Sequence, residues 1–167
     1  LQTDYLDLFL IHWPVPGHHV QAYKTLQSIM AETPQKIRGI GVSNYAVEDI
    51  QELINDPEVT EIPLVNQIEI NPFLYRRKTI QWCTDQGIVM QSYRSLRDGK
   101  AMNDPTLLKM ASKYNKTAAQ ILGRWWVQKG FVYMPKCVQT ARMQDNAQVF
   151  DFMLEVEDMK TLVALTT

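Results

Sequence analysis

Short apolar runs alternate along the chain with longer stretches of helical periodicity, and this alternation limits the fold more than any other feature. The five apolar runs are Leu6–Ile11, Ile37–Val42, Ile62–Ile68, Ile88–Ser92 and Phe131–Met134. The five helical stretches are Val20–Ala31, Val47–Ile54, Arg77–Asp85, Pro105–Tyr114 and Thr117–Lys129. Nearly every residue of the short runs is apolar, which is typical of parallel strands buried on both faces. The sequence therefore predicts an α/β fold of strand–helix–strand units with right-handed crossovers.

Local signals agree with these helices. Thr117 is a favoured N-cap before "AAQILGRWW", and Asp104-Pro105 combines a cap with a first-turn proline. Gly87 and Gly130 follow two of the stretches, as glycines that end helices do.

Two architectures fit this pattern, an open doubly wound sheet and a closed eight-stranded barrel. The first calls for a G-x-G-x-x-G fingerprint, but "RGIGVSNY" has Asn44 where the third glycine belongs. The barrel calls for polar groups at the carboxyl ends of several strands. Such groups stand at the C-terminal end of each predicted strand: His12, Ser43-Asn44, Asn66-Gln67, Tyr93 and Lys136. Each alone has an ordinary explanation, such as a helix cap, a core amide or a solvated charge, but their joint occurrence favours the barrel.

Composition limits the partners. The 167 residues are 46% hydrophobic and 21% charged, so a single domain over residues 1–167 can bury a core. A net charge of −1 without a basic stripe argues against nucleic acid, and no apolar run reaches the length of a membrane span. Cys83 and Cys137 form neither a disulfide framework nor a metal-binding pair, which favours a reducing compartment, the cytoplasm.

Five segments together resemble one family. They are "LDLFLIHWP", "IRGIGVSNY", "PLVNQIEINP", "IVMQSYRSL" and "YMPKCVQTARMQDNAQVFDF", in this order, and "LEVEDMKTL" resembles the family's helix near the end of the barrel. The family is the aldo-keto reductases, which are NADPH-dependent carbonyl reductases on an (α/β)8 barrel of the TIM type without a Rossmann motif. The resemblance runs from Leu1 to about Thr161.

The resemblance implies roles at the first three strand ends. His12 is the active-site histidine that would hydrogen-bond the substrate carbonyl oxygen, and Trp13 would line the substrate pocket. Ser43, Asn44 and Gln67 would bind the nicotinamide carboxamide, whose donor and acceptor suit these side chains.

It also implies a site for the rest of NADP(H). Tyr93 would stack on the nicotinamide ring, and Leu96 would pass over the pyrophosphate. Lys136 and Arg142 would hold the 2′-phosphate, which favours NADP over NAD. Arg94 stands where the family often has a serine, so a cation is expected near the pyrophosphate.

Further residues complete the adenosine end. Asp145 and Asn146 would meet the adenine. Cys137 replaces a common Ser or Thr beside the 2′-phosphate and is a weaker donor. No metal site is expected, and the adjacent His18 and His19 are interpreted as surface residues of a turn.

One part of the family's machinery has no counterpart here. The family's acid is a tyrosine, supported by a lysine and an aspartate, from the first three strands, and none of the seven tyrosines stands at that position. Closed barrels of this type need about 200 residues or more. We expect the last five βα units of a longer, monomeric enzyme that reduces a small carbonyl compound, with the piece itself inactive. The alternatives are a non-catalytic relative on the same barrel and a natural, inert truncation.

Overall fold

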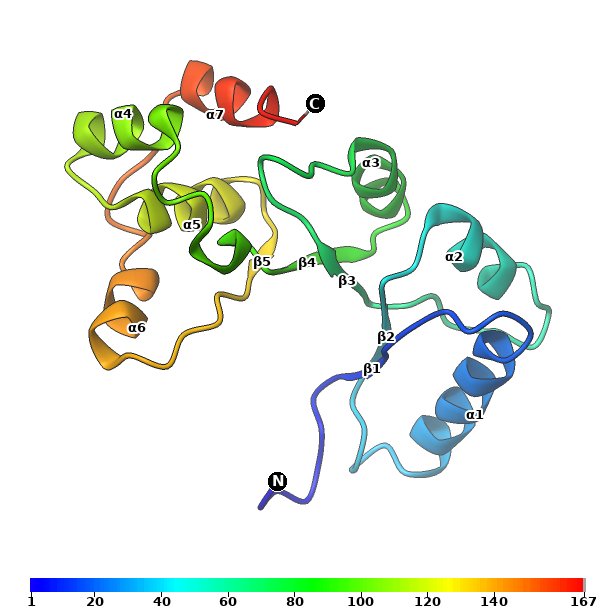
Figure 1. Ribbon diagram of the computed structural model, residues 1–167. Coiled ribbons are helices and arrows are strands. Elements are labelled where there is room, and N and C mark those ends of the chain that lie inside the picture. The colour runs from blue at the N-terminus through cyan, green and yellow to red at the C-terminus, as the bar shows by residue number, and fades with distance from the viewer. Residues whose placement is uncertain (167) are drawn as a thin grey trace. The chain divides into compact units, whose positions relative to one another are not determined.

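The structure is a computed structural model that describes residues 1–166, and it contains the alternating strands and helices that the sequence predicts (Figure 1). The strands are β1 (Phe9–Ile11), β2 (Ile40–Ser43), β3 (Val65–Glu69), β4 (Val89–Tyr93) and β5 (Val132–Tyr133). The helices are α1 (His19–Glu32), α2 (Val47–Ile54), α3 (Arg77–Asp85), α4 (Pro105–Tyr114), α5 (Ala118–Gln128), α6 (Thr140–Ala147) and α7 (Val156–Val163). A 3-10 turn, η1, covers Arg97–Gly99.

The strands form a parallel sheet in the order β1-β2-β3-β4-β5, so every neighbour in the sheet is also the next strand along the chain. In register, Phe9 pairs with Ile40, Ser43 with Gln67 and Ser92 with Tyr133. An unbroken order of consecutive parallel strands is the order of a barrel of βα units, whereas a doubly wound sheet reverses its order at a switch point. The prediction of a TIM-type α/β architecture with five βα units is confirmed.

The chain divides into two compact units, which we describe one at a time. The first unit holds residues Leu1–Ile68 and Arg77–Met90, and the second holds Glu69–Arg76 and the chain from Gln91 onward. The division runs through β3 and β4. The expectation of a single domain stays a prediction.

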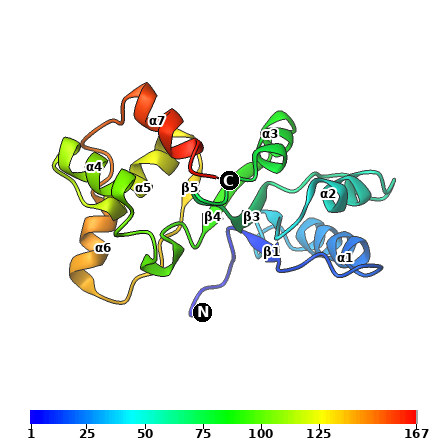
Figure 2. The same cartoon turned by 45° about the horizontal axis from the view of Figure 1, so that its top comes forward.

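In the first unit, α1 and α2 lie side by side, as both cartoon views show (Figures 1 and 2). His19 begins α1 and is only 2% exposed. Its Nε2 lies 3.2 Å from Glu52 Oε2, and the edge of its ring faces Tyr45 at 5.4 Å between centroids. The interpretation of His19 as a surface residue is therefore wrong: the helix starts one residue earlier than its apolar pattern and turns this side chain toward α2.

In the second unit, α5 supplies the centre of the core. Trp125 and Trp126 are both fully buried, with ring centroids 4.3 Å apart. Gly123 lets the same helix approach β5, because a Cβ there would lie 2.9 Å from the Tyr133 ring and 2.9 Å from a Val149 methyl. The core of this unit is thus set by close packing around one helix.

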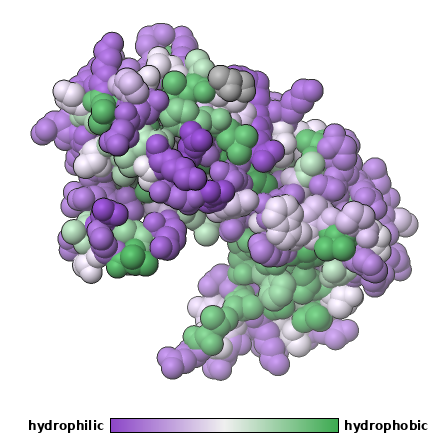
Figure 3. Space-filling model, viewed as in Figure 1, coloured by the Kyte–Doolittle hydropathy of each residue, from purple (hydrophilic) through white to green (hydrophobic). Residues whose placement is uncertain are grey.

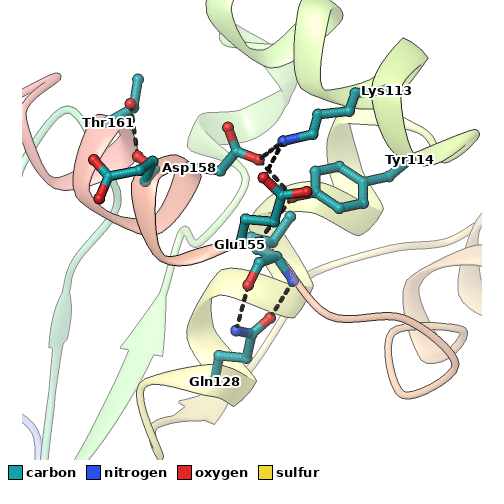
Figure 4. A network of polar contacts seen from close by, with 8 residues as sticks. Lys113, Tyr114, Gln128, Glu155, Asp158 and Thr161 are labelled. Atoms are coloured by element: carbon teal, nitrogen blue, oxygen red, sulfur yellow. Dashed lines mark hydrogen bonds and ion pairs between the residues drawn. The ribbon is translucent and has the colours of Figure 1, made fainter.

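A polar network fastens α7 to α4 in the second unit (Figure 4). Lys113 Nζ lies 2.7 Å from Glu155 Oε2 and 2.8 Å from Asp158 Oδ2. The Tyr114 hydroxyl donates to Asp158 and accepts from the Glu155 amide at 2.8 Å. Gln128 of α5 bonds both backbone groups of Leu154, so the segment before α7 is held as well.

Apolar side chains gather on the surface of the first unit over β1 (Figure 3). Phe9 is 38% exposed, and Leu64 of the segment before β3 is 53% exposed. Within residues 1–166, β1 pairs on one side only, with β2. None of the helices described in those residues is both long and apolar enough to cross a membrane.

Candidate cofactor site

Four predicted residues at the carboxyl ends of β1, β2 and β3 are joined by hydrogen bonds in the first unit. We call His12, Ser43, Asn44 and Gln67 the strand-end cluster. The Ser43 hydroxyl donates to the Gln67 carbonyl at 2.7 Å, and the Asn44 amide N–H donates to the same carbonyl at 3.0 Å. The Asn44 side-chain nitrogen donates to the His12 carbonyl at 2.9 Å and lies 3.2 Å from Ser43 Oγ. These bonds fix the backbones of three strand ends in one place.

The backbone at Asn44 has a conformation that suits asparagine. Its φ is 64°, in the left-handed region that asparagine enters more readily than most residues. The backbone of the next residue, Tyr45, is also fixed, because the buried Asn66 side chain donates to the Tyr45 carbonyl at 3.0 Å. Asn44 therefore stands where the third glycine of a dinucleotide fingerprint would be, and it serves this turn instead.

His12 and Trp13 leave the sheet together. Both are exposed, Trp13 at 55%, and their ring centroids are 5.9 Å apart. The Asn44 side chain holds the His12 backbone carbonyl and the imidazole stays exposed, and the expected bond from His12 to a substrate carbonyl stays a prediction.

The second unit contains a cavity of about 640 Å3, which we call the cationic cavity. Six residues predicted to bind NADP(H) line it: Leu96, Lys136, Cys137, Arg142, Asp145 and Asn146. They come from the loop after β4, the loop after β5 and helix α6. The volume is within the usual range for cofactor and ligand sites.

The charges of this cavity suit a phosphate. Within residues 1–166, no side-chain hydrogen bond or ion pair involves the Lys136 ammonium or the Arg142 guanidinium. Arg142 lies in the first turn of α6, and Gln139 before that helix also lines the cavity, so backbone N–H groups add to the positive potential. A 2′-phosphate fits these cations in sign and in donor type.

Tyr93 ends β4 in the same unit and is half-buried. It does not line the cationic cavity, so its predicted stacking on nicotinamide stays a prediction. Arg94, directly after it, does line the cavity and brings the expected cation.

One charged residue of the cavity was missed by the sequence analysis. Asp98 lines the cavity together with Arg94 and Lys136. Hydrogen bonding from Arg94 holds the pKa of Asp98 below its usual value, helped by the charges of Lys100 and Lys136. No sequence signal marks this carboxylate, because its place depends on how the loop after β4 folds.

Cys137 borders the cationic cavity and also a second, mainly apolar cavity of about 710 Å3 beside β5. Its thiol is half-buried, whereas Cys83 is fully buried, and burial raises the pKa of the Cys83 thiol. Among the residues that the structure describes, no three His, Cys, Asp or Glu side chains come together in a way that could hold a metal ion.

Comparison with known proteins defines the class. The family model described as "Aldo/keto reductase family" matches residues 1–167. The glyoxal reductase of Bacillus subtilis is 39% identical over 165 residues, and the methylglyoxal reductase DkgA of Yersinia pestis is 39% identical over 169 residues. These matches cover 99% of this chain in both cases, and 58% and 60% of the two relatives.

Solved structures agree with the sequence match. The crystal structure of Gox0644 in its apoform superposes with a TM-score of 0.93 at 32% identity, covering 98% of this chain and 60% of that one. A mutant of Gox0644 in complex with NADPH superposes with a TM-score of 0.91. The chain belongs to the aldo/keto reductase family and spans about three fifths of the length of these relatives.

Proposed function

We propose that this chain carries the NADP(H)-binding part of an oxidoreductase that reduces a small aldehyde or ketone to the alcohol. The observation that carries the proposal is the cationic cavity, where six predicted cofactor-binding residues from three segments meet. Within the described chain, the side chains of Lys136 and Arg142 form no ion pair there. The names of the relatives, glyoxal and methylglyoxal reductase, and the NADPH complex of a structural neighbour support the same function.

The residues of this chain have positioning tasks. NADPH, when bound, supplies a hydride. Lys136 and Arg142 hold the 2′-phosphate, and Asp145 and Asn146 lie beside them for the adenine. Placement of this kind is most of what a hydride-transfer protein contributes, because the cofactor carries the chemistry itself.

The strand-end cluster serves the reacting end. Ser43, Asn44 and Gln67 bind the nicotinamide carboxamide through their remaining donors and acceptors. His12 donates a hydrogen bond to the substrate carbonyl oxygen and orients the carbonyl. Because the family's tyrosine, lysine and aspartate have no counterpart in this sequence, we propose that the chain binds the cofactor without turning it over.

A titration tests the proposal. Quenching of the tryptophan fluorescence by NADPH and by NADH gives both dissociation constants. One charge-assisted contact to a phosphate is worth about 1.5 kcal/mol at the lower end of its range, so NADPH should bind about tenfold or more tightly than NADH. Equal dissociation constants would overturn the assignment of Lys136 and Arg142.

Two variants sharpen the result. Arg142→Gln should weaken NADPH binding about tenfold and leave NADH binding unchanged. Lys109→Gln on α4 removes an equal charge outside the lining of the cavity and should leave both constants unchanged. A loss of the same size in Lys109→Gln would mean that only the overall charge of the protein matters.

A further inference from the structure

The loop after β4 has an unusual backbone. Arg94, Arg97 and Asp98 have φ values of 49°, 49° and 54°, and Gly99 follows at 81°. Residues other than glycine are disfavoured in this left-handed region, so the surrounding contacts must hold the loop in this shape.

Arg94 supplies these contacts. Its Nε lies 3.1 Å from Asp98 Oδ2, and its Nη2 donates to the same oxygen. Its Nη1 lies 3.2 Å from Glu69 Oε2. The guanidinium that faces the cationic cavity is therefore engaged by two carboxylates, in contrast to Lys136 and Arg142.

Three cations act on the Asp98 carboxylate. It lines the cavity, binds Arg94 directly and lies close enough to Lys100 and Lys136 for both to act on its charge. A carboxylate in this position occupies Arg94, a cation that a phosphate would otherwise use.

We propose that Asp98 is a built-in competitor for the anionic ligand of the cationic cavity: its carboxylate holds Arg94, and a phosphate of the ligand must displace it. The inference rests on the proposed function only for the identity of the ligand, NADP(H). On binding, Arg94 exchanges the Asp98 carboxylate for a ligand phosphate, and no covalent bond changes. Asp98 thereby sets the affinity below what the cations alone would give.

Asp98→Asn is the decisive variant. Asparagine tolerates the left-handed backbone of this position, so the loop can keep its shape while the charge is lost. Half-exposed charges interact weakly, and exposed pairs are worth no more than a factor of about five. We therefore expect Asp98→Asn to bind NADPH about two- to fivefold more tightly, with a smaller gain at high salt.

The control is Asp151→Asn. Asp151 is also exposed and also pairs with one cation, Lys116 at 2.6 Å, but it does not line the cavity. It changes the net charge by the same amount. In a third variant, Arg94→Gln with Asp98→Asn, the gain should disappear, because the freed guanidinium is what the ligand uses.

Calorimetric titrations with NADPH, NADH and inorganic pyrophosphate separate the outcomes. Equal gains for the two dinucleotides support competition with the diphosphate, and a larger gain for NADPH supports competition with the 2′-phosphate. If only pyrophosphate binds, and binds more tightly to Asp98→Asn, the competition stands and the proposed function fails. If Asp98→Asn binds none of the three more tightly than the unchanged chain, or Asp151→Asn gains as much, the proposal is overturned. Far-ultraviolet circular dichroism confirms that the variants compared are folded.

Discussion

Replacing Asn44 tests how the strand-end cluster is built. Its side-chain nitrogen donates to the His12 carbonyl at 2.9 Å, and its φ is 64°. Asn44→Ala removes the hydrogen bond, at about 1 kcal/mol, and places alanine in the left-handed region, at about 1–2 kcal/mol. The expected loss in the free energy of unfolding is about 2.5 kcal/mol.

Asn44→Gly separates the contribution of the lost hydrogen bond from that of the backbone strain. Glycine also loses the hydrogen bond but adopts this φ without strain. The greater freedom of glycine in the unfolded chain adds about 0.5 kcal/mol. The total is about 1.5 kcal/mol, so the glycine variant should be about 1 kcal/mol more stable than the alanine variant.

The assay is urea unfolding monitored by circular dichroism. Midpoints are compared only between variants whose transitions have equal slopes. Equal midpoints for Asn44→Ala and Asn44→Gly would refute the argument from backbone strain. A loss below about 0.5 kcal/mol in both variants would refute the role of the bond to His12.

Three further predictions concern other parts of the chain. Burial acts to raise the pKa of Asp158, but hydrogen bonds, above all from Lys113, outweigh burial and lower the pKa. The stability that this carboxylate contributes is therefore present above its unfolded pKa of about 4. It is lost as the pH falls through the lower folded pKa. Asp158→Asn should therefore lower the urea midpoint at pH 7, and the difference from the unchanged chain should shrink near pH 3. Iodoacetamide should modify the half-buried Cys137 before the buried Cys83, and NADPH should slow the first reaction, as peptide mass mapping will show. Gly41→Ala should cost about 2 kcal/mol in urea unfolding, because its Cβ would lie 2.9 Å from a backbone oxygen; a loss below about 0.5 kcal/mol would show that the sheet can yield.

Local signals explain how much of the fold was predictable. The bounds of α2, α3 and α4 agree with the sequence prediction, and the Asp104 side chain caps α4 by accepting from two backbone N–H groups. Thr117 and Gln120 form the capping box that starts α5. Helix α6 was not predicted, since Asn146 is its one buried residue and an apolar stripe is missing. Its position comes from tertiary contacts, which a single segment does not encode.

The candidate site was also predictable in part. Family motifs predicted residues that the structure does bring together, in the strand-end cluster and in the cationic cavity. Asp98 and the buried His19 were beyond reach of the sequence. The first depends on left-handed residues in a loop, and the second on the packing of α1 against α2. Both positions depend on backbone shape or helix packing that the motifs do not describe.

A crystal structure of this chain grown with NADPH tests the central claim most directly. The account predicts electron density for the 2′-phosphate between Lys136 and Arg142 in the cationic cavity, with the adenine beside Asp145 and Asn146. A nucleotide ordered at another place on the chain, with these four side chains left in contact with solvent alone, would contradict it.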